Sequence, residues 1–402
     1  MKKIISVCIA VALAAAALTG CGPEKETKDF SDANLMVKGF RNFVTDVNYN
    51  SFGKGGDLFT EKYPGAVVNF EVGGQGGQGD DLVAAVTAGD PWDIQLVIGV
   101  FLPGLFKNDL FEPLDDLIDI NDEVYSTNFM KEFASYDGKV YGASNIIMGD
   151  YDYAIYNENM FKDFGIKMPI EYYKEGNWNR EAVLTMIDDL KKAGCPMAFS
   201  MGGVSLNTYT FSKDKDGKVT STISSKESRD YLEFVRTIMY EKNIPDSSGN
   251  VLTRGRAYDM GGLPVGLFRN VSDDPVDTVR YIPFPTANEK GSYMTDYHFA
   301  IPRGAKNPEA SAELIRFLVQ GALEDRSAKY SAAMTEEDYK IFKEDIIDAE
   351  KAYTLRAPGY GISGGDVIKD FKAGKSVGQF ISENETRAQK AAEDYNKEYF
   401  GE

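Results

Sequence analysis

Few side chains in this sequence are arranged for acid–base or metal chemistry. The 402 residues include one histidine, His298, and three cysteines. A structural zinc site needs about four nitrogen or sulfur ligands, and common catalytic zinc sites use more than one histidine. No G-x-S-x-G motif accompanies His298, so a histidine at the start of a strand, with its hydrogen bonds satisfied or partly exposed to solvent, is favoured over a catalytic triad. The sequence predicts neither a metal site nor a cofactor, and it does not predict an enzyme.

One glycine-rich stretch, residues 74–79, satisfies the pattern G-x-G-x-x-G. In dinucleotide-binding proteins such a loop holds a pyrophosphate at a helix N-terminus, with an acidic residue about 20 residues further on. Here Asp80 and Asp81 would put negative charge beside the pyrophosphate, and Asp93 follows the motif by only fourteen residues. We therefore favour a plain loop between a strand and a helix. The alternative is a loop at the carboxyl edge of a sheet, where Gln75 hydrogen-bonds a solute.

A second motif, Asp214 to Gly217, resembles the beginning of a calcium-binding loop. Lys218 stands where a third ligand would belong, and no glutamate closes the loop at the matching place. An aspartate followed by a glycine also favours a tight turn between two antiparallel strands. We therefore predict a β-hairpin here and no calcium site.

The composition excludes further classes of protein. Apolar residues make up 43% of the chain and charged residues 26%, which is typical of globular proteins. The formal net charge is −18, and so acidic a surface repels phosphate backbones, which argues against nucleic-acid binding. A chain of this length suggests two or three domains.

The beginning of the chain resembles a bacterial lipoprotein signal peptide. Two lysines precede an uncharged apolar run, residues 4–18, which is shorter than a membrane span. Residues 18–21, Leu-Thr-Gly-Cys, resemble a lipobox, which implies cleavage before Cys21 and acyl chains such as palmitate on that residue. We expect a signal peptide at 1–20 and a lipidated flexible tether at 21–33. The protein would then lie on the extracellular face of the cell membrane, or face the periplasm if the source has an outer membrane.

Loss of the signal peptide would leave two cysteines, Cys21 at the anchor and Cys195. No intramolecular disulfide is then possible. Cys195 follows an expected helix and has no histidine nearby in the sequence, so we predict a buried, structural thiol.

The body of the chain alternates between expected strands and helices. Residues 66–72 and 93–99 are predicted as strands, and residues 81–88 as a helix that ends at a glycine. Val83 and Val86 belong to the predicted apolar face of that helix. A succession of strand, helix and strand argues for a parallel sheet.

Helix caps mark the later helices. Asn179 is predicted to cap a helix that stops at Gly194, and Ser224 to begin a capping box. Pro308 suits a first helical position, and Thr335 begins another capping box. The economical fold class is α/β, with two lobes and a helical C-terminal third.

Five segments together resemble the extracellular solute-binding proteins that serve carbohydrate ABC transporters. They are residues 59–65 (FTEKYPG), 88–94 (AGDPWDI), 136–166 (beginning YDGKVYG), 178–192, and 299–318 (beginning FAIPRGA). Each segment is weak alone, but their order and spacing make the combination fairly specific.

The resemblance implies a two-lobe, Venus-flytrap fold that closes on a carbohydrate ligand. It implies an N-lobe of residues 34–148 plus 294–333 and a C-lobe of residues 149–293 plus 334–402, joined by hinge crossings. It also implies delivery of a sugar or oligosaccharide to the permease subunits of an ABC transporter. We expect a monomer that contacts the membrane only through its lipid anchor.

The family binds its ligands at strand ends and near the crossings between the lobes. Sugars offer apolar faces to aromatic rings, and hydroxyls to carboxylates, amides and arginine. Because the chain has two tryptophans but 24 phenylalanines and 23 tyrosines, we expect stacking on tyrosine or phenylalanine. The ligand-binding residues that we predict are Gln75, Phe101, Asp150, Tyr151, Asn207, Tyr209, Phe268, Arg269, Asp296, Tyr297 and Tyr360.

Other classes of function stay open at this point. An exported glycan-acting enzyme would use two carboxylates about 5–10 Å apart, and no motif pairs two acids in this sequence. A binding protein for a non-sugar solute such as a peptide, or a surface sensor or adhesion module, would share much of the same pattern.

Overall fold

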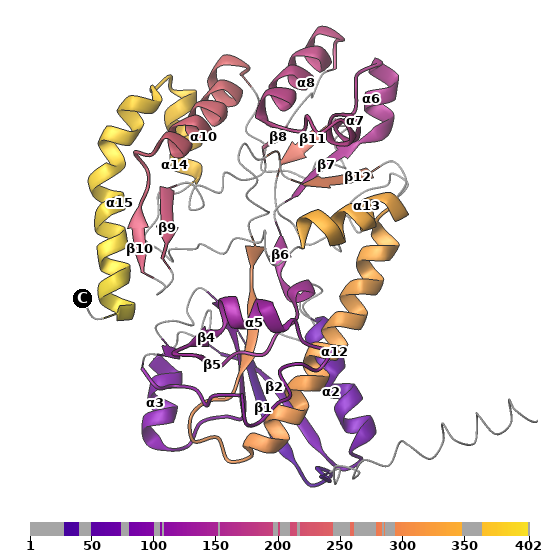
Figure 1. The fold of residues 1–402 in the computed structure, drawn as a ribbon, viewed down its shortest axis with the longest axis vertical. Coiled ribbons are helices and arrows are strands. Elements are labelled where there is room, and N and C mark those ends of the chain that lie inside the picture. Colours follow the sequence, from indigo (N-terminus) through magenta and orange to yellow (C-terminus); the bar gives the residue numbers. More distant parts are fainter. Residues whose placement is uncertain are drawn as a thin grey trace, which may run out of the picture.

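In the computed structural model, the described residues are 28–39, 50–73, 80–99, 105–106, 108–151, 153–195, 200–201, 210–214, 218–243, 258–260, 279–283, 285, 294–347 and 364–400. Their helices and strands gather in two lobes, as Figure 1 shows. We name the lobe that contains β1 the N-lobe and the lobe that contains β7 the C-lobe. This arrangement confirms the predicted two-lobe α/β fold class.

The N-lobe is built on a four-stranded sheet in the order β14-β3-β1-β2. The strand β1 lies parallel to both β2 and β3, which confirms the predicted parallel pairing. The strand β14 arrives from far later in the sequence and runs antiparallel to β3, with Tyr297 opposite Ile98. These strands are β1 (Asn34–Gly39), β2 (Val67–Val72), β3 (Ile94–Ile98) and β14 (Tyr297–Ala300).

The helix α3 (Asp80–Ala88) lies where it was predicted, but part of its predicted apolar face is wrong. Leu82 is 1% exposed and Val86 packs beside it against the same hydrophobic cluster, whereas Val83 is 48% exposed. Leu82 and Val86 are about one helical turn apart, but Val83 is rotated by about 100° from Leu82. Val83 therefore faces away from the sheet.

Two helices of the N-lobe touch backbone to backbone. They are α2 (Asn50–Lys62) and α12 (Pro308–Ala333), which begins at the predicted proline. A Cβ atom on Gly55 would lie 2.3 Å from the Cα atom of Leu318, and one on Gly321 would lie 2.5 Å from the backbone nitrogen of Gly55. The helices can approach this closely only because both contact positions lack a side chain.

The C-lobe has a four-stranded sheet in the order β12-β7-β11-β8. Its central strand β7 is antiparallel to both β11 and β12, while β11 and β8 are parallel. The strands are β7 (Tyr153–Asn157), β8 (Ser200–Met201), β11 (Tyr258–Met260) and β12 (Val279–Pro283). The helices are α6 (Glu158–Phe164), α7 (Pro169–Lys174), α8 (Arg180–Lys192), α10 (Lys226–Arg236), α13 (Glu336–Ile341), α14 (Gly364–Lys372) and α15 (Val377–Phe400).

Shorter elements complete the described part of the chain. They are α5 (Thr127–Phe133), β4 (Ser135–Tyr136), β5 (Lys139–Val140), the 3₁₀ turn η3 (Ile146–Met148), β6 (Asp150–Tyr151), β9 (Phe211–Lys213), β10 (Val219–Ser221), β13 (Met294–Thr295), and the π-turns η4 (Thr237–Glu241) and η7 (Phe342–Ile346).

The helix caps agree with the predictions except at one residue. The Asn179 side chain accepts a hydrogen bond from Ala182, and the Thr335 hydroxyl accepts one from Asp338, as predicted. The cap of α10 is Ser225, not Ser224, whose hydroxyl instead donates to Glu385 on α15. Adjacent serines offer the same cap chemistry, and the start of the helix decides which of them is used.

The predicted hairpin and the predicted buried thiol are also present. The strands β9 and β10 pair antiparallel around residues 215–217, and the backbone N–H of Lys218 donates to the Asp214 carboxylate. Cys195 is buried in the core of the C-lobe. Residues 1–27, which include Cys21, and the glycine-rich loop 74–79 lie outside the described residues.

Candidate functional site

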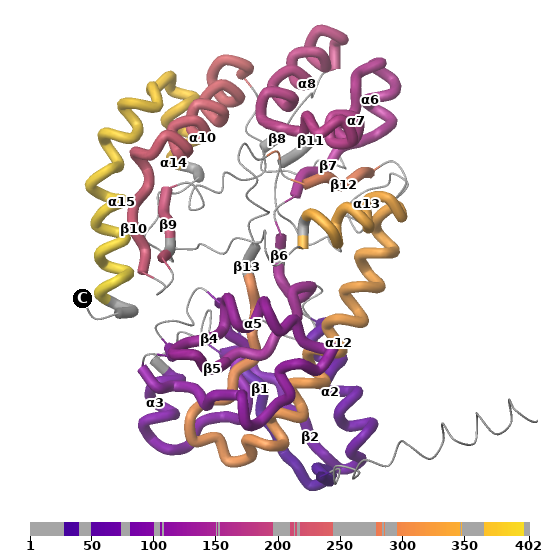
Figure 2. Tube along the Cα trace, viewed as in Figure 1, coloured from indigo at the N-terminus to yellow at the C-terminus, as the bar shows by residue number. Residues whose placement is uncertain are grey.

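Two short strands cross between the lobes side by side. The strand β6 pairs antiparallel with β13, with Asp150 opposite Thr295. Figure 2 shows β6 between the N-lobe and the C-lobe. Asp296 and Tyr297 directly follow β13. The crossing therefore brings two of the predicted ligand segments, residues 150–151 and 296–297, next to each other.

Tyr151 is buried at this crossing, with 4% of its surface exposed. Its hydroxyl donates to the carbonyl of Ile146, and its ring meets Phe342 edge-on at a centroid distance of 6.2 Å. Ile146 belongs to η3 at the N-lobe side, and Phe342 follows α13. Tyr151 thus connects elements on the two sides of the crossing.

Asp296 is buried as well, and its carboxylate is engaged inside the N-lobe. Its Oδ2 atom lies 2.8 Å from Nε2 of His298, and its carbonyl accepts a hydrogen bond from Gly99 at 3.0 Å. His298 is fully buried and stacks on Phe129, while its Nδ1 atom has no hydrogen-bond partner among the described residues. His298 is therefore not partly exposed, and the prediction that its hydrogen bonds are satisfied is confirmed at Nε2 only.

Tyr297 is 3% exposed and belongs to the core of the N-lobe. Its ring meets Phe52 of α2 at 6.3 Å, and its carbonyl accepts a hydrogen bond from the Ser144 hydroxyl at 2.6 Å. Tyr151, Asp296 and Tyr297 are therefore all buried in this conformation, where they support the crossing strands.

The other predicted ligand residues fall outside what the structure describes. For Asp150 the backbone is described but the side chain is not. The residues outside the described part of the chain are Gln75, Phe101, Asn207, Tyr209, Phe268, Arg269 and Tyr360.

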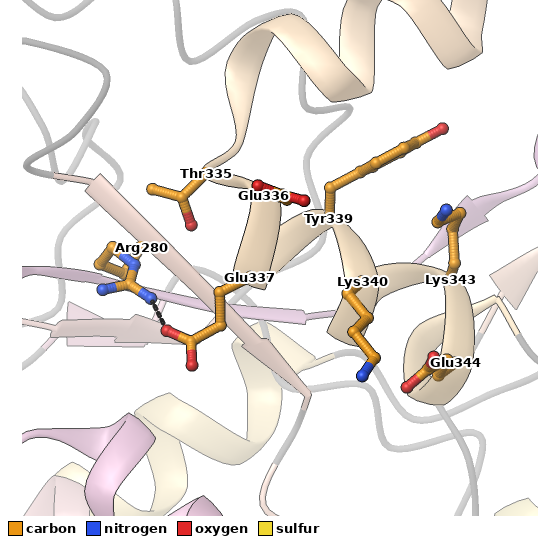
Figure 3. Close-up of a pocket in the computed structure, with 8 residues that line it drawn as sticks. All are labelled: Arg280, Thr335, Glu336, Glu337, Tyr339, Lys340, Lys343 and Glu344. Atoms are coloured by element: carbon orange, nitrogen blue, oxygen red, sulfur yellow. Dashed lines mark hydrogen bonds and ion pairs between the residues drawn. The ribbon is translucent and has the colours of Figure 1, made fainter.

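A cavity of about 930 Å³ lies beside α13. Figure 3 shows its lining side chains, which come from β12, α13 and η7. Three carboxylates and three cations surround a single aromatic ring. The lining residues are Arg280, Thr335, Glu336, Glu337, Tyr339, Lys340, Lys343 and Glu344. None of them was predicted as a ligand residue.

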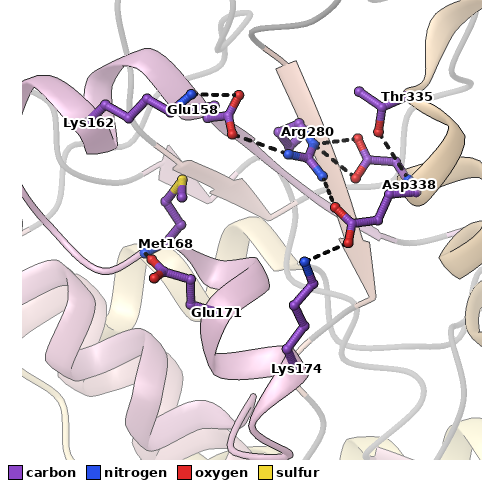
Figure 4. Close-up of polar contacts among 9 residues, drawn as sticks. Glu158, Lys162, Met168, Glu171, Lys174, Arg280, Thr335 and Asp338 are labelled. Carbon is purple, nitrogen blue, oxygen red and sulfur yellow. Dashed lines mark hydrogen bonds and ion pairs between the residues drawn. The ribbon is translucent and has the colours of Figure 1, made fainter.

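Arg280 connects this cavity to a partly buried cluster of charges (Figure 4). Its Nε atom donates to both oxygens of Asp338, at 3.0 and 2.8 Å, and its terminal nitrogens reach Glu158 at 3.3 Å and Glu337 at 2.8 Å. Lys174 also pairs with Glu337, at 2.6 Å. The cluster joins β12, α6, α7 and α13, so it attaches α13 to the C-lobe.

The hydrogen bond from Lys174 holds the pKa of Glu337 below its ordinary value, and the bond from Arg280 acts in the same direction, while partial burial opposes them. This cluster was not predicted, because its members lie on four separate elements. The only local signal was the spacing of Thr335 and Asp338, which predicts the helix cap but says nothing of the Asp338 carboxylate.

Two further findings concern metals and membranes. In the part of the chain that the structure describes, no group of three or more histidine, cysteine, aspartate or glutamate side chains could hold a metal ion. No helix there is both long and apolar enough to span a bilayer.

Comparisons with known proteins give a family and a fold. Residues 38–320 match the family model described as bacterial extracellular solute-binding protein. No curated protein matches the chain.

Among solved structures, this chain is similar to the galacto-N-biose-/lacto-N-biose I-binding protein of the ABC transporter from Bifidobacterium longum, in complex with lacto-N-biose. The identity is 12% and the TM-score 0.68, over 92% of this chain and 98% of that chain. The GacH receptor of Streptomyces glaucescens, solved unliganded and with acarbose, is 15% identical with a TM-score of 0.66, over 92% and 98% of the chains. The sugar-binding protein MalE from Xanthomonas citri is also 15% identical with a TM-score of 0.66, over 92% and 100% of the chains. At these identities the likeness establishes the fold.

Proposed function

Because the chain belongs to the bacterial extracellular solute-binding proteins, we propose that it captures a sugar or an oligosaccharide and delivers it to the permease of an ABC transporter. The observation that carries this proposal is the pair of crossing strands, β6 and β13, at which two lobes meet, each with a hydrophobic core of its own. Two lobes on short crossing strands can close on a solute by rotating about them. The similar structures bind lacto-N-biose and acarbose, which supports a saccharide as the solute.

We further propose where each lobe begins and ends. The N-lobe comprises residues 34–148 plus 294–333, and the C-lobe residues 149–293 plus 334–402. This division is supported by the hydrophobic cores, one of which draws on residues before 149 and between 297 and 322, and the other on residues between 154 and 282 and after 340.

The proposed ligand contacts are of two kinds. Asp150 is the proposed direct contact at the crossing, since a carboxylate accepts hydrogen bonds from sugar hydroxyls. Tyr151, Asp296 and Tyr297 are buried, so their proposed part is to hold the crossing in shape around the ligand. The further proposed contacts are Gln75, Phe101, Asn207, Tyr209, Phe268, Arg269 and Tyr360.

We also propose that the protein is a monomeric lipoprotein on the extracellular face of the cell membrane. Cleavage after residue 20 would expose Cys21 for acylation, and residues 21–33 would tether the lobes to the membrane. Labelling of growing cells with radioactive palmitate tests this proposal: the wild-type chain should be labelled and Cys21→Ala should not. Equal labelling of both would refute the assignment of Cys21.

A thermal-shift screen of the purified protein tests the proposed function. It should include monosaccharides, oligosaccharides, amino acids, peptides and metal ions. We expect at least one saccharide to raise the melting temperature and to be recovered chemically unchanged, because a binding protein has no turnover. A shift with a peptide or an anion alone would overturn the sugar assignment, and hydrolysis of the saccharide would favour an enzyme.

A further inference from the structure

Arg326 is a buried arginine on the apolar face of α12. It is 5% exposed and is flanked along the helix by Ala322 and Tyr330, which are also buried and lie one turn away on either side. Burying a guanidinium costs several kcal/mol unless the group is fully hydrogen-bonded. The hydrogen-bond partners of Arg326 therefore indicate its role in the structure.

The partners of Arg326 include backbone carbonyls at the beginning of the first crossing between the lobes. One terminal nitrogen donates to the carbonyls of Met148 at 2.7 Å and Gly149 at 3.1 Å, and lies 3.5 Å from that of Ile147. These carbonyls end the 3₁₀ turn η3, and carbonyls at a helix end lack partners within the helix. A cation there is also favoured by the partial negative charge of the turn.

The same guanidinium is held from the side of the N-lobe. It lies over the ring of Phe52 at 5.3 Å, and that ring packs edge-on against Phe299 of β14 at 5.5 Å. The helix that carries Arg326 is itself packed against α2 through Gly55 and Gly321. Arg326 therefore attaches the end of η3 to the part of the N-lobe where α2 and α12 are in close contact.

The position of this attachment along the chain sets where movement can start. Gly149, whose carbonyl accepts a hydrogen bond from Arg326, is followed by Asp150 at the beginning of β6. Tyr151 donates its hydroxyl back to Ile146 of the same turn. The end of η3 is thereby attached to the N-lobe helix that carries Arg326, so rotation of the C-lobe can be absorbed in the strand that follows.

We propose that Arg326 is a positioning residue for solute capture, which fixes the end of η3 so that closure pivots at Asp150. This inference rests on the proposed function, since Asp150 is the proposed polar contact with the ligand. Loss of the guanidinium would leave the carbonyls of Met148 and Gly149 unpaired and the start of β6 free to shift. The proposed carboxylate would then no longer be held where the closed lobes need it.

The test compares Arg326→Met and Arg326→Lys with a matched control, Arg316→Met. Arg316 lies on the same helix, about 15 Å away, and pairs with Asp122 at 2.7 Å, far from the crossing strands. Calorimetric titration with the saccharide found in the thermal-shift screen gives the Kd, urea denaturation gives the stability, and hydrogen exchange measures the amides of residues 148–151.

We expect Arg326→Met to raise the Kd about tenfold or more and to speed exchange at residues 148–151, because a charged hydrogen-bond network is lost at the crossing. Arg326→Lys should lie between this variant and the wild type. The control should lose stability with a Kd within about twofold of the wild type. If Arg326→Met and the control show the same Kd, the role is only structural and the proposal is overturned.

The proposal can still be tested if Arg326→Met does not fold or if the wild-type protein binds no saccharide. If Arg326→Met does not fold, Arg326→Lys decides: a Kd equal to that of the wild type overturns the proposal, and a raised Kd supports it. If the wild-type protein binds no saccharide, the proposed function is wrong. The positioning role of Arg326 is then tested by the hydrogen-exchange measurement alone. Faster exchange at residues 148–151 than in the control would then support the positioning role, and equal exchange would overturn it.

Discussion

Glu337 lies between two cations that come from different elements. Lys174 of α7 reaches one carboxylate oxygen at 2.6 Å, and Arg280 of β12 reaches the other at 2.8 Å. Hydrogen bonds to the charged form of a carboxylate favour that form, which is why the pKa of Glu337 lies below its ordinary value of 4.5. The lowered pKa of Glu337 determines how this residue affects the stability of the fold as the pH changes.

A group with a lowered pKa in the folded state stabilises the fold above its unfolded pKa, and the contribution is lost as the pH falls through its folded pKa. The wild-type protein should therefore lose part of its unfolding free energy when the pH falls from about 7 to about 3. We predict that Glu337→Gln loses less, because glutamine carries no titrating carboxylate. Urea denaturation at both pH values measures the difference. The control is Glu336→Gln, an exposed neighbour, which should keep the wild-type pH dependence. Equal pH dependence in the wild type and Glu337→Gln would contradict the prediction.

Asp150 carries the second prediction at this scale. We expect Asp150→Ala to weaken saccharide binding by about 1–3 kcal/mol, because a charged hydrogen bond to the ligand is lost. Calorimetric titration measures the change, and urea denaturation should show little loss of stability. Asp163→Ala removes the same charge from an exposed position on α6 and should bind like the wild type. Unchanged affinity in Asp150→Ala would remove this residue from the proposed site.

Asp338 illustrates which residue contacts can be predicted from a sequence. Its backbone N–H donates to the Thr335 hydroxyl at 3.1 Å, a contact over three residues that the capping pattern predicts. Its carboxylate binds Arg280, a partner 58 residues away on a strand of the C-lobe. Local spacing holds no information on such a partner, because the fold alone brings the two residues together.

At the scale of elements, the contact between α2 and α12 depends on two glycines. Gly55 and Gly321 each approach the backbone of the opposite helix more closely than any Cβ atom could. Such a contact requires the helices to keep one relative position along their length. Any added methyl group must push them apart.

We predict that Gly55→Ala destabilises the protein by about 1–3 kcal/mol, since overpacking displaces backbone rather than a flexible side chain. Gly321→Ala should act in the same direction. The control is Gly378→Ala at the exposed start of α15, where a new Cβ atom would meet nothing within 4 Å and helix propensity should add up to about 1 kcal/mol of stability. Urea denaturation measures all three, and a neutral Gly55→Ala would show that the helices can separate freely.

Helix prediction succeeded where caps and apolar spacing agreed. In α8, Asn179 caps the first turn and Val183, Met186, Ile187 and Leu190 are all buried, as their spacing indicates. In α3 the spacing was ambiguous, and Val83 is exposed because the helix covers the sheet with a narrower face than predicted. The apolar spacing of α10 predicts that the helix continues to Ile238 and Met239, and the structure confirms this: both residues are buried in the π-turn η4, which packs against α14.

At the scale of the whole molecule, solute binding and stability are linked. A ligand that binds only the folded protein raises the free energy of unfolding by RT ln(1 + [L]/Kd), which is about 2.7 kcal/mol at a hundred times the Kd. We predict this increase with the saccharide from the screen, together with a smaller radius of gyration in small-angle scattering as the lobes close. Stabilisation without any change in the scattering curve would show that binding does not close the lobes.

The overall architecture was predicted from five resembling segments rather than from composition or periodicity. The strand–helix–strand order around residues 66–99 predicted the parallel strands β1, β2 and β3 only in part, because it did not include β1. The antiparallel strand β14 and the mostly antiparallel sheet of the C-lobe were not predicted. These pairings join distant parts of the chain, and the sequence of one strand does not indicate which other strand pairs with it.

The late arrival of β14 also has a consequence for how the chain folds during synthesis. Until residue 300 has been made, β3 has a free edge of unpaired backbone groups, and α2 has no α12 to pack against. Unpaired edges of this kind favour aggregation, and pairings between distant residues form slowly. A chain that ends before residue 294 therefore lacks part of each proposed lobe, so neither lobe can be completed before the last part of the chain is present.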